Sequence, residues 1–147
     1  MSKIRLYTIG FTKKSAEDFF EALKKMKIKT LIDIRLNNQS QLAGFSKGKD
    51  LPYFLKEICS CAYIHLPEWA PTKEILDSYK KKQSTWETYE KQFRFLLSQR
   101  DIISEASQMD LGNACLLCSE PTADKCHRRL VAEHLADNID GLSIWHI

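Results

Sequence analysis

The sequence has no long apolar run, no internal repeat and no low-complexity tract. A membrane-spanning helix needs about 20 apolar residues, and no stretch of the chain approaches that length. The start MSKIRLYTIG is basic but lacks the apolar segment and the small-residue cleavage site of a signal peptide. We therefore expect a cytoplasmic protein without a membrane partner. Its 147 residues fit one domain spanning residues 1–147.

The chain also lacks an even number of cysteines and a strong net charge. Five cysteines cannot all pair within one chain, and the cytosol is reducing, so thiol chemistry, metal binding or simple burial is favoured over a disulfide framework. A net charge of +3 suits a small anionic or nucleotide-like ligand and gives only weak support for nucleic acid as a partner. The lysines at residues 80–82 are typical of a solvated surface, with a phosphate-facing patch as the alternative. Nothing in the composition indicates an oligomeric state.

Short apolar runs alternate with amphipathic segments along the chain. This alternation predicts an α/β fold, a Rossmann-like three-layer sandwich with an open, mostly parallel sheet of about five strands. Ser15 is the expected N-cap of the first helix. The predicted strands cover residues 4–10, 29–35, 61–66, 113–120 and 142–147.

The remaining segments are expected to be mostly helical. One helix is predicted over residues 51–59, and two more over 67–108, divided near Gln83 with Ser84 as a cap. A last helix over residues 125–137 would be capped by Asp124 or Thr122 and stopped by Gly141.

Polar side chains follow the predicted strands where each one ends. In open parallel sheets, ligands bind outside the carboxyl ends of the strands, so we expect a functional site at this edge. Structural roles are the alternative, because Asp33 can pair with Arg35 and His65 can be a hydrogen-bonded core histidine. Cys59, Cys61 and Cys115 are interpreted as core thiols. The candidate residues are Gly10, Asp33, Arg35, His65, Glu68, Cys118, Glu120, Cys126, His127 and Arg128.

The segment LLCSEPTADKCHRR, residues 116–129, allows several chemistries. A zinc site would use Cys115, Cys118, Cys126 and His127, but adjacent Cys126 and His127 are not expected to reach one ion, so no metal is predicted. A tyrosine-phosphatase loop needs a cysteine and an arginine around a short loop, and here the first arginine lies ten residues after Cys118. A rhodanese-like site, suggested by LIDIR, lacks the same compact loop.

The start of the helix in this segment favours either a reactive thiol or a bound anion. Free backbone N–H groups and the positive end of the helix dipole face that point. Cys126 in the first turn, beside His127 and Arg128, would have a lowered pKa. The same N–H groups, with Arg128 or Arg129 and Arg35, would hold a phosphate. A thiolate and a phosphate repel each other, so either role alone is favoured over both. Cys118 and Cys126 could also form a reversible disulfide if they lie close together.

Several segments of the chain, in this order, resemble the bacterial and archaeal family called domain of unknown function 488. The resemblance rests on TIGFTKKSAEDFFEALKKMKIKTLIDIR, on GFSK at Phe45, on YIHLPE, and on LLCSEPTADKCHRRLVAEHL with the terminal IWHI. It implies an α/β fold and a shared site, with Cys118, Glu120, Cys126, His127 and Arg128 as its hallmark. Trp69 stands where members tend to have a leucine. The family name carries no activity.

Two functions are therefore considered. In the first, the protein is an enzyme on a phosphate-bearing substrate, nucleotide-like or nucleic acid. Arg35, Arg128 and the helix N-terminus hold the anion, Asp33, Glu120 or His65 act as acid or base, and Cys118 and Cys126 shape the site or react. Gly10, Glu68 and His127 complete the ligand-binding set, and no cofactor is expected. The alternative is a non-catalytic ligand-binding or redox-sensing module in which Cys118 and Cys126 switch between dithiol and disulfide. A scaffold whose polar residues only satisfy one another is the third interpretation.

Overall fold

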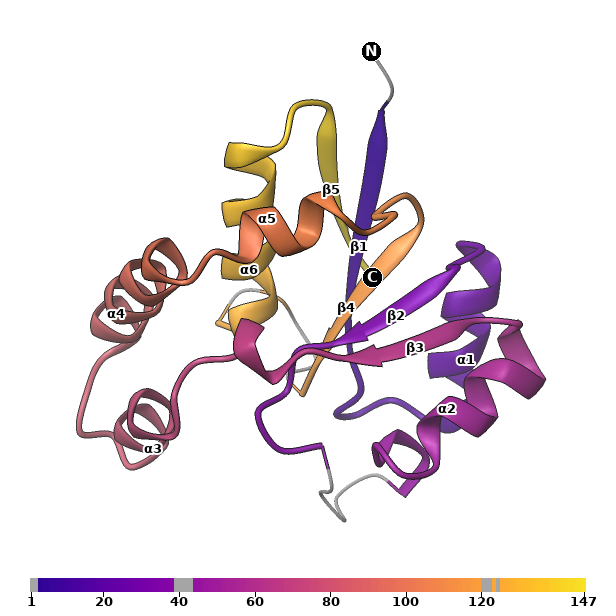
Figure 1. Cartoon of the computed structure of the whole chain (residues 1–147). Helices are drawn as coiled ribbons and strands as arrows, with labels where there is room; N and C mark the ends of the chain where they lie inside the picture. Colours follow the sequence, from indigo (N-terminus) through magenta and orange to yellow (C-terminus); the bar gives the residue numbers. More distant parts are fainter. Residues whose placement is uncertain (1–2, 39–43, 120–122, 124) are drawn as a thin grey trace.

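The apolar runs form the strands of one sheet. The structure, a computed structural model, describes residues 3–38, 44–119, 123 and 125–147, and Figure 1 shows a sheet with helices on both faces. Its strands are β1 (Ile4–Gly10), β2 (Thr30–Asp33), β3 (Ala62–His65), β4 (Ala114–Cys118) and β5 (Leu142–His146).

All five strands are parallel, in the order β3-β2-β4-β1-β5. The predicted α/β fold with an open parallel sheet is confirmed. In the register, Gly10 lies opposite Cys118, and Asp33 lies between His65 and Leu117. The carboxyl ends of β1, β4, β2 and β3 therefore meet at one edge, as the positional argument requires.

Helices cover the sheet in two layers, and each layer has its own apolar core. Successive side chains of β4 point alternately into the two cores. Leu116 and Cys118 face the layer of α4, α5 and α6, whereas Cys115 and Leu117 face α1 and α2. Cys61 is buried in the second core, as predicted for a core thiol. The helices are α1 (Ala16–Lys25), α2 (Leu51–Phe54), α3 (Lys73–Lys80), α4 (Trp86–Gln99), α5 (Ile102–Ser107) and α6 (His127–Asn138). A π-helical turn, η2 (Leu55–Cys59), continues α2, and 3₁₀ turns η1 (Gly44–Ser46) and η3 (Pro67–Trp69) complete the set.

Local capping explains most helix starts and corrects two predictions. Ser15 caps α1 by accepting a hydrogen bond from the Asp18 backbone N–H, as expected. Residues 67–108 hold three α-helices rather than two, because Asp101 caps a separate α5. Thr85, not Ser84, caps α4.

The last helix also begins later than predicted. It starts at His127 with Cys126 as its N-cap residue, and Asp124 and Thr122 lie outside the described residues. It ends at Asn138 with Ile139 as its C-cap residue. Gly141, expected to stop this helix, adopts φ 81° in the turn that leads into β5.

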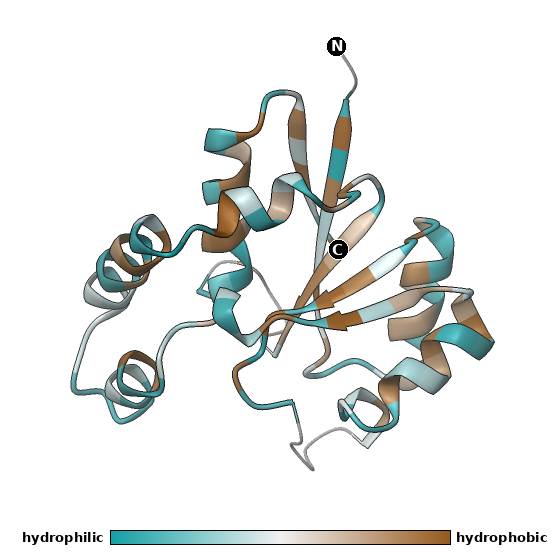
Figure 2. Cartoon of the chain, viewed as in Figure 1, coloured by the Kyte–Doolittle hydropathy of each residue, from teal (hydrophilic) through white to brown (hydrophobic). Residues whose placement is uncertain are grey.

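Hydropathy follows this layering. Brown, hydrophobic residues recur in the strands, and most connecting segments are teal or white (Figure 2). Trp69, the residue that departs from the resemblance, is fully buried and donates its indole N–H to Glu105 at 2.6 Å. Among the described residues, no helix has the length and hydropathy that crossing a membrane requires.

Candidate functional site

A buried ion pair stands at the end of β2. Arg35 donates from Nε and Nη2 to the two carboxylate oxygens of Asp33, at 2.8 and 2.7 Å. Its backbone N–H also donates to Asp33, and Tyr63 donates its hydroxyl to the same carboxylate at 2.6 Å. Asp33 is 0% exposed and Arg35 is 3% exposed. Because both oxygens of Asp33 already accept hydrogen bonds, this carboxylate is arranged to orient Arg35.

One nitrogen of Arg35 has no acceptor among the described residues. Nη2 also donates to the Ser46 carbonyl oxygen at 2.6 Å, and the guanidinium carbon lies 5.2 Å from the centre of the Phe11 ring. Nη1 is buried, and no group in the described part of the chain accepts a hydrogen bond from it. A buried cationic donor without an acceptor is costly, so this nitrogen is suited to a ligand that brings one.

Arg128 lies behind the strand ends rather than at the surface. It is 1% exposed, and its Nε donates to the Thr8 hydroxyl at 3.1 Å. Its Nη1 donates to the sulfur of Cys118 at 3.6 Å. The Thr8 hydroxyl is also hydrogen-bonded to Nδ1 of His146. The pKa of His146 is lowered, mainly by burial and further by the charge of Arg128.

His127, the first residue of α6, is held by a backbone group of a different layer. Its Nε2 lies 2.6 Å from the carbonyl oxygen of Ile34. A carbonyl oxygen can only accept, so Nε2 carries the proton and donates. Burial lowers the pKa of His127 to about 4, with Arg128 also lowering it and the bond to Ile34 opposing the shift. The ring is therefore neutral near pH 7, with the lone pair on Nδ1.

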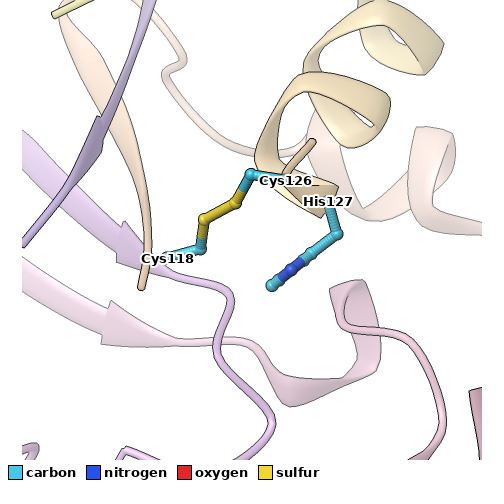
Figure 3. A group of neighbouring side chains, drawn as sticks. All are labelled: Cys118, Cys126 and His127. Carbon is cyan, nitrogen blue, oxygen red and sulfur yellow. A yellow bond between two sulfur atoms is a disulfide. The ribbon is translucent and has the colours of Figure 1, made fainter. Parts of the chain in front are cut away.

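The two cysteines of the segment LLCSEPTADKCHRR are joined. Cys118 ends β4, Cys126 precedes α6, and their sulfur atoms form a disulfide (Figure 3). One donor atom from each of Cys118, Cys126 and His127 lies within 4.8 Å of the others, and all three residues are buried. The structure thus brings Cys126 and His127 together with Cys118, and the expectation that adjacent Cys126 and His127 do not reach one ion stays a prediction. Cys115 takes no part, because it points to the opposite face of the sheet.

A cleft of about 770 Å³ opens beside this cluster. Its walls come from the residues after β2, from α3, from Tyr89 of α4, and from the segment around the start of α6. Five cationic side chains and one carboxylate line it, so it is positively charged. Its lining residues are Arg35, Leu36, Asn37, Lys73, Leu76, Asp77, Tyr79, Lys80, Lys82, Ser84, Tyr89, Ser119, Lys125, Cys126 and His127.

The cleft contains only part of the predicted site. Arg35, Cys126 and His127 line it, and Cys118 and Asp33 lie directly behind two of them. The lysines of residues 73, 80, 82 and 125 were not assigned to the site, although the phosphate-facing alternative for residues 80–82 was the one signal for them.

The other predicted residues are found elsewhere. His65 uses Nε2 to bond the Arg35 carbonyl oxygen at 2.8 Å, which holds the chain after β2. Glu68 is in η3, where its backbone carbonyl accepts from Arg100. Gly10 ends β1 beside Cys118, and Arg128 is in the interior. None of these four lines the cleft as described, and Glu120 lies outside the described residues.

Comparison with known proteins identifies one match. The family described as "Domain of unknown function DUF488" matches residues 15–135. Neither the curated proteins nor the solved structures provide a match to the chain. The matched range includes β2, α3, β4 and most of α6, which supply the residues around the cleft.

Proposed function

Because the chain belongs to the DUF488 family, whose description names no activity, we propose a function from the site itself: the cleft binds a phosphate-bearing ligand. The observation that carries the proposal is that Arg35 lines the cleft and that its buried Nη1 has no acceptor among the described residues. Arg35 is the anchor for the phosphate in this proposal, and the backbone N–H groups at the start of α6 complete the anion site.

The Asp33 carboxylate supports this role by its geometry. It occupies Nε and Nη2 of Arg35 and so leaves Nη1 as the group available to a ligand. A guanidinium held in one orientation loses little entropy when it binds an anion. The resulting site is pre-organised, which favours affinity.

The size and charge of the cleft support a ligand larger than phosphate alone. About 770 Å³ is within the range of small-molecule sites. Lys80, Lys82 and Lys125 add positive charge around it, and the Tyr79 and Tyr89 rings supply apolar wall. We propose that the ligand is a nucleotide-like molecule. The end of a nucleic acid is a larger ligand with the same phosphate chemistry.

Chemistry on the bound ligand would use the reactive groups that line the cleft. His127 offers a neutral ring with Nδ1 unprotonated, but burial lowers its pKa to about 4, so this nitrogen is a weak base near pH 7 and is not proposed as the catalytic base. Asp33 is less suited to proton transfer because both its oxygens are occupied. Release of product from a phosphate ester is the assay that tests whether the protein is an enzyme.

Calorimetric titration with inorganic phosphate, pyrophosphate and a nucleoside monophosphate tests the binding proposal. We expect saturable binding that Arg35→Lys weakens about tenfold, since lysine cannot reproduce the fork of donors. Lys80→Gln and Lys82→Gln should weaken it less. Lys25→Gln is the matched control, because Lys25 is exposed on α1 in the other helical layer. Absence of saturable binding by the wild type, or equal affinity in Arg35→Lys, would refute the proposal.

A second function rests on a separate observation, the bond between Cys118 and Cys126. We propose a redox-sensing module in which a cellular dithiol reduces this disulfide and becomes a disulfide itself. Equilibration with defined ratios of reduced and oxidised dithiothreitol, followed by alkylation and mass spectrometry, measures the potential. A pair that stays reduced in every mixture would exclude this function without affecting phosphate binding.

A further inference from the structure

Two sulfur donors and one nitrogen donor lie close together where β4 ends and α6 begins. Cys118 is the last residue of β4, Cys126 is the N-cap residue of α6, and His127 is its first residue. Figure 3 shows the three side chains together between the strand end and the helix start. Their donor atoms lie within 4.8 Å of one another. Two thiolates and an imidazole are a ligand set of zinc sites that keep one coordination position open.

The separation of the two backbones suits an ion between the sulfurs. The Cα atoms of Cys118 and Cys126 are 7.5 Å apart. In disulfides this distance is usually about 4.4–6.8 Å. Two thiolates on one zinc ion, each about 2.3 Å from the metal in a tetrahedral arrangement, hold their sulfurs about 3.8 Å apart. The backbone spacing thus provides room for the wider separation.

The environment of His127 matches that of a histidine ligand. A ligating histidine usually donates its second ring N–H to a carbonyl or a carboxylate, which fixes the tautomer and the ring orientation. Nε2 of His127 makes such a bond to the Ile34 carbonyl oxygen at 2.6 Å, so Nδ1 is the nitrogen available to a metal. Arg128 donates to the sulfur of Cys118 at 3.6 Å. A guanidinium in this position stabilises a thiolate.

We propose that the reduced protein binds one Zn²⁺ ion through Cys118, Cys126 and Nδ1 of His127, with the fourth coordination position toward the cleft. Cys126 and His127 both line that cleft, which gives the open position its direction. Binding releases the two thiol protons to solvent. Zinc and the disulfide exclude each other, because oxidation to the disulfide removes two electrons and leaves no thiolate to bind the metal. The site does not depend on the phosphate proposal.

Cobalt substitution tests the site directly. The protein is reduced with a phosphine under nitrogen, freed of metal with a chelator, and titrated with Co²⁺ and then Zn²⁺. We expect one ion per chain, sulfur-to-cobalt charge-transfer absorption and displacement of Co²⁺ by Zn²⁺. Cys126→Ser should lose at least about 100-fold in affinity and His127→Gln a similar factor, by comparison with the 10–100-fold typical of outer-shell losses. Cys59→Ser is the control, because Cys59 packs against the other core.

A measurement without substitutions guards against variants that fail to fold. Zn²⁺ added to the reduced wild type should protect Cys126, which lines the cleft, from iodoacetamide, as mapped by mass spectrometry, and leave the labelling of Cys59 unchanged. Metal binding that survives in Cys126→Ser, or alkylation of Cys126 that Zn²⁺ does not slow, would overturn the proposal. Either result would leave phosphate binding by the metal-free protein to be judged separately.

Discussion

Replacing Asp33 with asparagine is the sharpest test of the buried pair at the end of β2. The substitution keeps the shape of the side chain and removes its charge. Arg35 stays protonated, because its guanidinium does not lose a proton in proteins. It would then be a buried cation, 3% exposed, whose counter-charge is gone. Removing one partner of a buried ion pair costs about 3–5 kcal/mol.

That cost is a large share of the stability of a small domain. Stabilities of about 5–15 kcal/mol are usual, and for a chain of this size 1 kcal/mol corresponds to roughly 2–4 °C in Tm. We therefore expect Asp33→Asn to lower Tm by roughly 6–20 °C. Urea unfolding followed by circular dichroism should show a lower midpoint with an unchanged slope.

Two further measurements separate this mechanism from simple damage. Arg35→Met in the Asp33→Asn background should recover part of the loss, because it removes the uncompensated charge. Asp77→Asn is the matched control: Asp77 pairs with Lys73 at the surface, so its midpoint should hardly change. A loss below about 1 kcal/mol in Asp33→Asn would refute the reasoning, because a broken buried pair costs more.

Three other predictions concern Tyr63, His127 and the buried thiols. Tyr63→Phe removes the hydroxyl that donates to Asp33 and should cost about 1.5–3 kcal/mol in urea unfolding; an unchanged midpoint would contradict the bond. The pKa of His127 is lowered in the fold from 6.5 to about 4, so the unfolded state binds the proton first. In the metal-free protein the contribution of His127 to stability is complete above about pH 6.5 and falls by up to roughly 3 kcal/mol toward pH 4, and His127→Asn removes this part of the pH dependence. Burial raises the pKa of the Cys115 thiol and raises that of Cys61 to about 12. Neither should react with iodoacetamide in the folded protein near pH 7, whereas both should react in urea.

Local sequence patterns predicted the strands of the sheet well. Apolar runs located all five strands, and the rule that ligands bind at carboxyl ends placed Asp33, His65 and Cys118 on one edge. Alternation along β4 separated Cys115 from Cys118. These inferences depend on neighbours in the chain or on general topology, and both can be read from the sequence.

Contacts between distant segments could not be predicted in the same way. Nothing in the sequence states that the Ile34 carbonyl oxygen accepts from His127, or that α3 lines the cleft with Lys73 and Lys80. The starting point of α6 was missed because Cys126, an uncommon N-cap residue, takes that place without a side-chain capping bond. The helix starts two residues later than predicted, at His127, and the donor atoms of His127 and Cys118 lie within 4.8 Å of each other.

The charge at the strand ends links the two proposals. Among the described residues there, two buried guanidiniums, Arg35 and Arg128, accompany one buried carboxylate, Asp33, so the excess charge is positive. A disulfide between Cys118 and Cys126 leaves that excess intact, and so does a zinc ion bound by two thiolates, since the three charges cancel. Two bare thiolates would instead oppose an anion at Arg35. The metal thus allows the reduced protein to keep both its thiolates and its affinity for phosphate.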